Sequence, residues 1–178
     1  MTSRTTTITA TGLTALAIAA ALTACAPTPE PTPTPTGFAS EAEAFAAAEA
    51  TYRAYVDALN EVDLSDPDTF EPVFALTTGD LNATDREGLS RYHAEGVSVA
   101  GTSTALLIEP RSVDLPAAMQ LAVCLDVSSV TLTAPDGSSL VDVDRVDVQS
   151  LLITLEALPD HSAWRLADIE GRAGAPTC

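Results

Sequence analysis

The spacing of apolar residues changes once along this chain, near Val97, and that change limits the fold more than any other feature. Before Val97, apolar side chains recur at the spacing of one face of an α-helix. After it, apolar and polar side chains alternate, as in a half-buried β-strand. Because all the helices precede the strands, the pattern predicts an α+β fold with an antiparallel sheet.

The first helix is predicted to begin at Ser40. Ser40 is followed three residues later by Glu43, and this pair is typical of a capping box, in which both side chains accept backbone hydrogen bonds. One apolar face then follows at helical spacing: Phe45, Ala48, Tyr52, Val56 and Leu59. The pattern therefore predicts one long amphipathic helix that ends at Asn60.

Two shorter helices are expected next. Apolar residues over 70–76 indicate a short second helix, with Pro72 tolerated in its first turn. Thr84 and Glu87 repeat the capping pattern, so the third helix is predicted to start there and to stop near Gly96.

The strands follow the third helix. The segment 121–128 places Leu121, Val123, Leu125 and Val127 on one face and Cys124, Asp126 and Ser128 on the other. After the turn at 135–137, valines and leucines over 141–155 predict a bulged, bent strand. A turn at 159–162 then leads into a last strand over 164–169.

Residues 1–24 have the three parts of an export signal: Arg4 near the start, an uncharged apolar run, and small residues before a processing point. Leu-Thr-Ala-Cys25 resembles a bacterial lipobox residue for residue, which predicts a diacylglyceryl anchor on Cys25. The alternative is an ordinary secretory signal cut near Ala24 or Ala26. Either way, we expect the mature protein outside the cytoplasmic membrane, and the lipobox places it on the outer face of that membrane.

Residues 25–37 are predicted to be a spacer. Prolines alternate mainly with threonines there, which favours an extended polyproline II segment about 35 Å long. The remaining residues, 38–178, match the size of one domain with its own core. The predicted organisation is thus a signal peptide, a lipidated linker and one domain.

The three cysteines fit this organisation. Lipidation of Cys25 leaves Cys124 and Cys178, and an exported protein meets conditions in which a disulfide persists. We therefore expect Cys124 and Cys178 to pair. Closing a loop of about 55 residues stabilises a fold by roughly 4 kcal/mol through the lost entropy of the unfolded chain.

Charge excludes one class of partner. The chain has a net charge of −17 and no lysine, and removal of Arg4 with the leader leaves −18. Such a surface repels nucleic acid. No metal or cofactor is expected, because Asp142, Asp144 and Asp147 alternate with other residues as on a solvated strand face, and the phosphate-binding glycine patterns are missing.

The helix ending in Tyr55-Val-Asp-Ala-Leu-Asn60, two further helices, long bent strands and the closing segment 164–169 resemble the nuclear transport factor two-like superfamily. The resemblance covers nearly all of 38–178. It implies three helices packed on a strongly curved, cone-shaped antiparallel sheet, often with an apolar pocket inside. The nearest variants are exported lipoproteins of high-GC Gram-positive bacteria. The resemblance also allows a homodimer through paired sheet faces.

Two functions follow as hypotheses. We favour a non-catalytic, membrane-anchored accessory domain that binds an envelope protein or a small apolar ligand, with Tyr52, Tyr55 and Trp164 lining the pocket. The alternative is a small isomerase-like or cyclase-like enzyme. The resemblance implies for it a pocket tyrosine and an acid, and Tyr55 and Asp126 are the candidates, although Asp126 alternates away from the apolar face. Counting the acids and histidines inside the largest cavity discriminates between these hypotheses.

Overall fold

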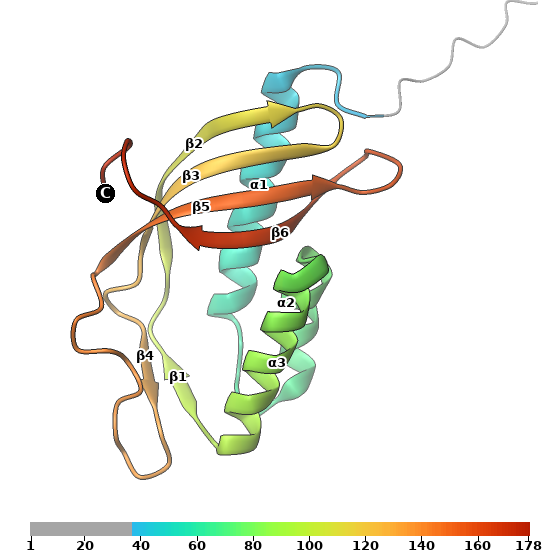
Figure 1. Cartoon of the computed structure of the whole chain (residues 1–178). Helices are drawn as coiled ribbons and strands as arrows, with labels where there is room; N and C mark the ends of the chain where they lie inside the picture. Colours follow the sequence, from blue (N-terminus) through green and yellow to red (C-terminus); the bar gives the residue numbers. More distant parts are fainter. Residues whose placement is uncertain (1–36) are drawn as a thin grey trace, which may run out of the picture. The chain divides into compact units, whose positions relative to one another are not determined.

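The computed structural model describes residues 37–178, so the predicted signal peptide, Cys25 and the linker up to residue 36 lie outside the described residues. Figure 1 shows a long helix crossed by a four-stranded sheet, with the shorter helices beside it. The helices are α1 (Glu41–Asn60), the 3₁₀ turn η1 (Pro67–Phe70), α2 (Glu71–Leu76) and α3 (Gly79–Glu95). The strands are β1 (Ser98–Ala100), β2 (Thr104–Asp114), β3 (Ala118–Asp126), β4 (Thr131–Thr133), β5 (Val148–Ala157) and β6 (Trp164–Gly171).

The strands form two antiparallel sheets. The larger has the order β2-β3-β5-β6, and the smaller pairs β1 with β4. Each neighbouring pair in these sheets is antiparallel. The predicted α+β class is therefore confirmed.

Helix α1 begins as its sequence predicts. The Ser40 side chain accepts a hydrogen bond from the Glu43 amide, and the Glu43 carboxylate accepts one from the Ala39 amide. The face of α1 toward the sheet is buried: Ala44, Ala48, Tyr52, Tyr55 and Val56. It packs on inward-facing sheet residues, among them Leu121, Val123, Ile153, Leu155 and Leu166.

The start of α3 was predicted wrongly. The helix begins at Gly79, so Thr84 and Glu87 lie inside it. The side-chain amide of Asn82 donates to the Phe74 carbonyl and to the Thr77 hydroxyl, and these contacts hold the junction between α2 and α3. The first half of α3 has one large apolar residue, Leu81, which is too few to define an apolar period from which the start could be predicted. The predicted end at Gly96 is correct, since Gly96 adopts a left-handed conformation with φ of 70°.

The bent strand predicted over 141–155 is also shorter than expected. Strand β5 starts at Val148, and residues 141–147 form a loop. Asp142 accepts a hydrogen bond from the Asp144 amide, and the Arg145 guanidinium donates to the carbonyls of Val127 and Val130. The valines over 141–147 match the sequence pattern of a strand, but Val143 is 95% exposed and the segment pairs with no sheet of residues 37–178.

The outer face of the sheet is partly covered by the C-terminal segment. Cys124 on β3 is bonded to Cys178, with 5.5 Å between their Cα atoms. The Arg172 guanidinium donates to the carbonyls of Leu151, Gly174 and Pro176. Cys124, 4% exposed, is therefore buried even though it alternates away from the main core.

Candidate functional site

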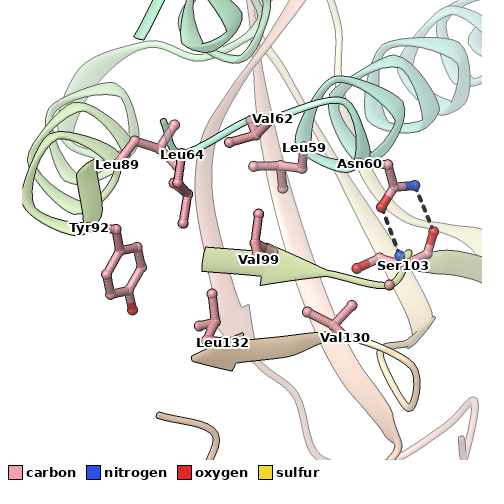
Figure 2. Close-up of a pocket in the computed structure, with 11 residues that line it drawn as sticks. Leu59, Asn60, Val62, Leu64, Leu89, Tyr92, Val99, Ser103, Val130 and Leu132 are labelled. Atoms are coloured by element: carbon pink, nitrogen blue, oxygen red, sulfur yellow. Dashed lines mark hydrogen bonds between the residues drawn. The ribbon is translucent and has the colours of Figure 1, made fainter. Parts of the chain in front are cut away.

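An apolar pocket of about 180 Å³ lies where the C-terminal end of α1 meets α3 and the small β1–β4 sheet. Figure 2 shows the side chains of Leu59 and Leu64 pointing toward those of Val99 and Leu132 across the pocket. The lining comprises Leu59, Asn60, Val62, Leu64, Leu89, Tyr92, Val99, Gly101, Ser103, Val130 and Leu132. Four separate stretches of the chain therefore build this site.

One end of the pocket is closed by a paired set of hydrogen bonds. The Asn60 side-chain amide donates to the Ser103 carbonyl at 3.0 Å, and the Ser103 amide donates to the Asn60 Oδ1 atom at 2.7 Å. These two bonds reproduce the exchange between opposite residues of an antiparallel sheet. Asn60 therefore holds the segment between β1 and β2 against the end of α1.

The lining of the pocket is mainly apolar. No aspartate, glutamate or histidine contributes to its lining, whose hydroxyls belong to Tyr92 and Ser103. A general acid or base needs a group that titrates near neutral pH within reach of the substrate. Nor do residues 37–178 contain a cluster of three histidine, cysteine or acidic side chains that could hold a metal ion. The lining therefore presents apolar side chains and a few polar groups, and none of its side chains titrates near neutral pH.

The size of the pocket limits what it can bind. A dry cavity of about 150 Å³ in another protein binds benzene. The present pocket, at about 180 Å³, therefore has room for an apolar group close to the size of one aromatic ring or one leucine side chain.

The residues predicted to line a pocket belong instead to the core. Tyr52, Tyr55 and Trp164 are 1%, 5% and 3% exposed, and none of them lines the 180 Å³ pocket. The Trp164 indole donates to the Ala44 carbonyl at 2.9 Å and stacks on Phe38, with 4.9 Å between ring centroids. Trp164 therefore packs near the start of α1, whereas the pocket lies at its end.

The candidate catalytic pair is not brought together. The Tyr55 hydroxyl donates to the carboxylate of Asp85 on α3, with 3.3 Å to each oxygen. Asp126 accepts a hydrogen bond from the Ser128 amide at the end of β3, and this bond lowers the pKa of Asp126. The polar partner of Tyr55 is thus supplied by α3 and not by β3.

Asp85 is the titratable residue that sequence reasoning missed. Burial raises its pKa to about 6, although the hydrogen bond from Tyr55 works in the opposite direction. Burial likewise raises the pKa of Tyr55, and the nearby Asp85 carboxylate raises it further. A signal was present in the sequence, because Asp85 lies four residues from both Leu81 and Leu89 and so shares their helix face.

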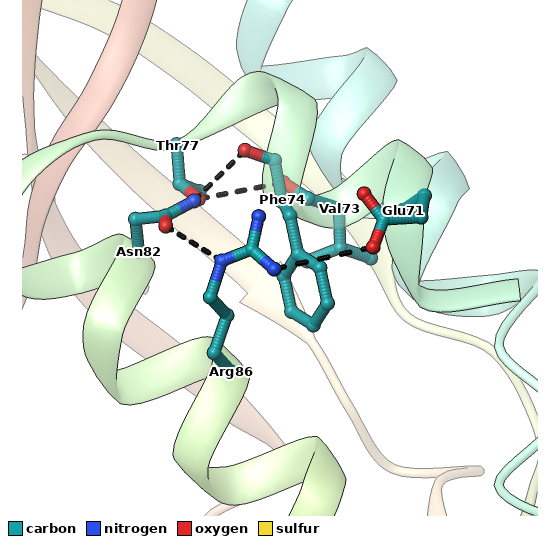
Figure 3. Close-up of polar contacts among 6 residues, drawn as sticks. All are labelled: Glu71, Val73, Phe74, Thr77, Asn82 and Arg86. Atoms are coloured by element: carbon teal, nitrogen blue, oxygen red, sulfur yellow. Dashed lines mark hydrogen bonds and ion pairs between the residues drawn. The ribbon is translucent and has the colours of Figure 1, made fainter. Parts of the chain in front are cut away.

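A second polar cluster joins α2 to α3. Figure 3 shows the Thr77, Asn82 and Arg86 side chains linked in a row beside Phe74. Arg86 Nε donates to Asn82 Oδ1 at 3.0 Å, and its guanidinium carbon lies 4.1 Å from the centre of the Phe74 ring. Glu71 lies 3.9 Å from the same guanidinium. These polar groups satisfy one another, which makes the cluster a structural joint between the helices.

Among the known proteins compared, similarity is found only to solved structures. No protein-family model matches the chain, and no curated protein matches it either. The intermembrane space region of the chloroplast protein ARC6 matches with a TM-score of 0.51 and 12% identity, over 71% of this chain and 95% of that one. An IcmL-like type IV secretion system protein from Legionella pneumophila gives 0.45 and 14%, over 80% and 99%. A periplasmic fragment of TraM gives 0.37 and 11%, over 71% and 98%.

These similarities bear on the fold alone. At 12% identity, the match to the ARC6 region indicates a similar arrangement of helices and strands. The other two matches are too distant to support an argument. Within residues 37–178, no helix has both the length and the apolar character that a membrane span requires.

Proposed function

We propose that this protein is a lipid-anchored domain of the cell envelope, with a nuclear transport factor two-like cone fold, that binds an apolar group without chemical conversion. The single observation that supports binding is the 180 Å³ pocket, which has an apolar lining and no acid or histidine. The site lies at the junction of α1, α3 and the β1–β4 sheet, where separate elements converge. Such junctions are common places for ligand sites.

Two features support a location outside the cytoplasmic membrane. The sequence Leu-Thr-Ala-Cys25 follows an apolar leader, as in a lipoprotein signal. The bond between Cys124 and Cys178 suits an oxidising compartment. Mass spectrometry of the mature protein tests the anchor: a chain that starts at Cys25 and carries diacylglycerol supports it, and an unmodified Cys25 refutes it.

The enzyme alternative has one supporting observation, the contact between Tyr55 and Asp85. A tyrosine beside a half-buried acid with a raised pKa is a combination used for proton transfer. However, neither residue lines the 180 Å³ pocket, so a substrate bound there would not reach them. The binding function is therefore the better supported of the two.

The binding function is tested with ring-sized apolar probes. We expect toluene and indole to shift amide NMR signals of pocket residues such as Val99 and Leu132 in saturable titrations. Val130→Phe places a ring in the pocket and should abolish these shifts. The matched control is Val143→Phe, which adds the same ring at a site that is 95% exposed. If neither probe binds wild type, or if Val130→Phe binds them unchanged, the pocket is not a ligand site.

A further inference from the structure

The apolar pocket is the middle part of a longer groove. A hollow of about 420 Å³ adjoins it on one side and shares Val62, Leu64 and Val99 with it. A hollow of about 350 Å³ adjoins it on the other side and shares Asn60 and Ser103. One wall of all three hollows comes from residues 53–65, and the segment 97–105 runs along all three. The groove is therefore elongated and follows the chain from β1 into β2.

The backbone of β1 is unpaired on the side away from β4. Val99 lies opposite Leu132, whose carbonyl accepts a hydrogen bond from the Leu140 amide on the far side of β4. The amide and carbonyl of one residue in an antiparallel strand point the same way, so those of Leu132 point away from β1. Because Val99 lies opposite Leu132, the amide and carbonyl of Val99 must point away from β4. Within residues 37–178, neither group of Val99 has a hydrogen-bond partner.

Asn60 makes a strand-like contact with the segment that follows β1. Its side-chain amide exchanges two hydrogen bonds with Ser103, four residues beyond Val99 along the same segment. Those bonds have the geometry that an added strand would give. The groups of Val99 offer the next such pair beside the pocket, and an extended chain is the kind of ligand that makes it.

The charge of the groove selects against an acidic ligand. Asp57 lines the hollow at one end of the groove, and Asp63 lines the hollow at the other end. Arg53 is the basic side chain of the lining, and Glu49 holds its guanidinium at 2.8 Å. The whole chain carries a net charge of −17. A ligand with positive charge on both sides of an apolar residue complements this arrangement.

We propose that the groove binds an extended, basic segment of another envelope protein. The segment pairs with Val99 as a short added strand and places one leucine-sized or phenylalanine-sized side chain in the pocket. This inference rests on the proposed binding function and names the partner's chemistry. It differs from simple ligand capture because it requires main-chain pairing and positive charge in addition to an apolar anchor.

A synthetic probe tests the proposal on the purified domain with its disulfide intact. The probe is the C-terminally amidated peptide Arg-Thr-Arg-Phe-Arg-Thr-Arg with a fluorophore on its N-terminal amine, and its binding is followed by fluorescence anisotropy. Replacing its phenylalanine with serine should weaken binding at least about tenfold, because the buried ring is lost. Methylating the amide nitrogen of its phenylalanine should weaken binding about fivefold, because that group donates to Val99. Methylating the amide of the next arginine is the matched control, since neighbouring amides of a strand point in opposite directions.

Substitutions in the protein complete the test. Val130→Phe should weaken binding of the probe at least about tenfold, whereas Val143→Phe should leave it within about twofold. The double variant Asp57→Asn and Asp63→Asn should weaken it severalfold and reduce its dependence on salt. Because an asparagine side chain at position 63 would keep an oxygen that accepts from the Ser65 amide, the local turn should persist.

The outcomes separate this inference from the function on which it rests. If toluene and indole bind but the peptide does not, or if both methylated peptides bind equally, the strand-pairing partner is overturned and the apolar pocket stands. If the probes and the peptide all fail, both proposals fall. Self-association of the domain that Val130→Phe abolishes, seen by sedimentation, would show that a second copy occupies the groove and would also overturn the proposal.

Discussion

The Tyr55 hydroxyl on α1 donates to the Asp85 carboxylate on α3, 3.3 Å from each of its oxygens. Helix α3 contributes no fully buried residue, and its Leu81, Leu89 and Tyr92 side chains pack partly buried against the core. Tyr55 itself is 5% exposed, and the Asp85 carboxylate that it contacts is half-buried. The contact between α1 and α3 therefore includes a carboxyl group whose pKa is raised to about 6.

Asp85 should make stability depend on pH near neutrality. Its folded pKa, about 6, lies above the ordinary value of 3.8, so the folded state binds this proton more tightly than the unfolded state. The free energy of unfolding should therefore rise as the pH falls through about 6, and the added stability is absent above it. Asp85→Asn removes this group and should stabilise the domain at neutral pH by about 1 kcal/mol, a value reduced for partial exposure.

Urea unfolding of wild type and Asp85→Asn between about pH 4 and about pH 7 measures this effect. The difference between the two curves isolates Asp85 from the other carboxylates. Tyr55→Phe is a useful companion, because loss of the hydrogen bond should raise the pKa of Asp85 further. Parallel pH profiles for wild type and Asp85→Asn would contradict the assignment.

Asn60→Ala should loosen the pocket. The substitution removes two hydrogen bonds and leaves the amide and carbonyl of Ser103 without a protein partner. The expected loss in the free energy of unfolding is about 1–3 kcal/mol. Hydrogen exchange should show faster opening at Ser103 while amides of the central strand β3 stay protected. An unchanged exchange rate at Ser103 would mean that the Asn60 contact does not form in solution.

Two glycines should respond oppositely to alanine. Gly101 has φ of 85°, and a Cβ atom there would collide with the Ser129 carbonyl oxygen, so Gly101→Ala should cost more than about 2 kcal/mol. Gly88 lies inside α3 with nothing near the position of a Cβ atom. Gly88→Ala should stabilise the domain by about 0.5–1 kcal/mol. Denaturant unfolding of both variants tests the conformation of the segment between β1 and β2, and equal effects would argue against it.

Loss of the bond between Cys124 and Cys178 should destabilise the domain without changing its fold. The bond spans 54 residues, and its removal releases loop entropy in the unfolded chain worth about 2–4 kcal/mol. Cys124→Ala combined with Cys178→Ser should show this loss in urea unfolding, and treatment of wild type with a reductant should reproduce it. Two free thiols in the untreated, folded wild type would show that the bond does not form.

Much of the chain's local structure could be predicted from local patterns. The capping pair Ser40 and Glu43 and the stop at Gly96 depend on neighbouring residues, and the structure contains both. The prediction was wrong where the spacing of apolar residues fits a strand and a loop equally well. Alternating valines over 141–147 satisfy the strand pattern, but Arg145 binds the carbonyls of Val127 and Val130 and holds the segment in a loop.

The site depends on contacts that no local pattern contains. The pocket brings together Leu59, Leu89, Val99 and Leu132, which belong to four separate stretches of the chain. Sequence reasoning placed a pocket at Tyr52, Tyr55 and Trp164, but those side chains are buried in the core and line no part of the 180 Å³ pocket. A cavity exists where packing is incomplete, and only the three-dimensional arrangement shows where that is.

The sequence by itself determined the order of helices and strands, because hydrogen bonding and the burial of one face act over neighbouring residues. The tertiary structure decided which distant groups meet: Tyr55 with Asp85 instead of Asp126, and Asn60 with Ser103. These pairings depend on how α1, α3 and the two sheets pack, and packing is a property of the whole core. For that reason the apolar pocket and the unpaired edge of β1 are apparent only in the folded structure.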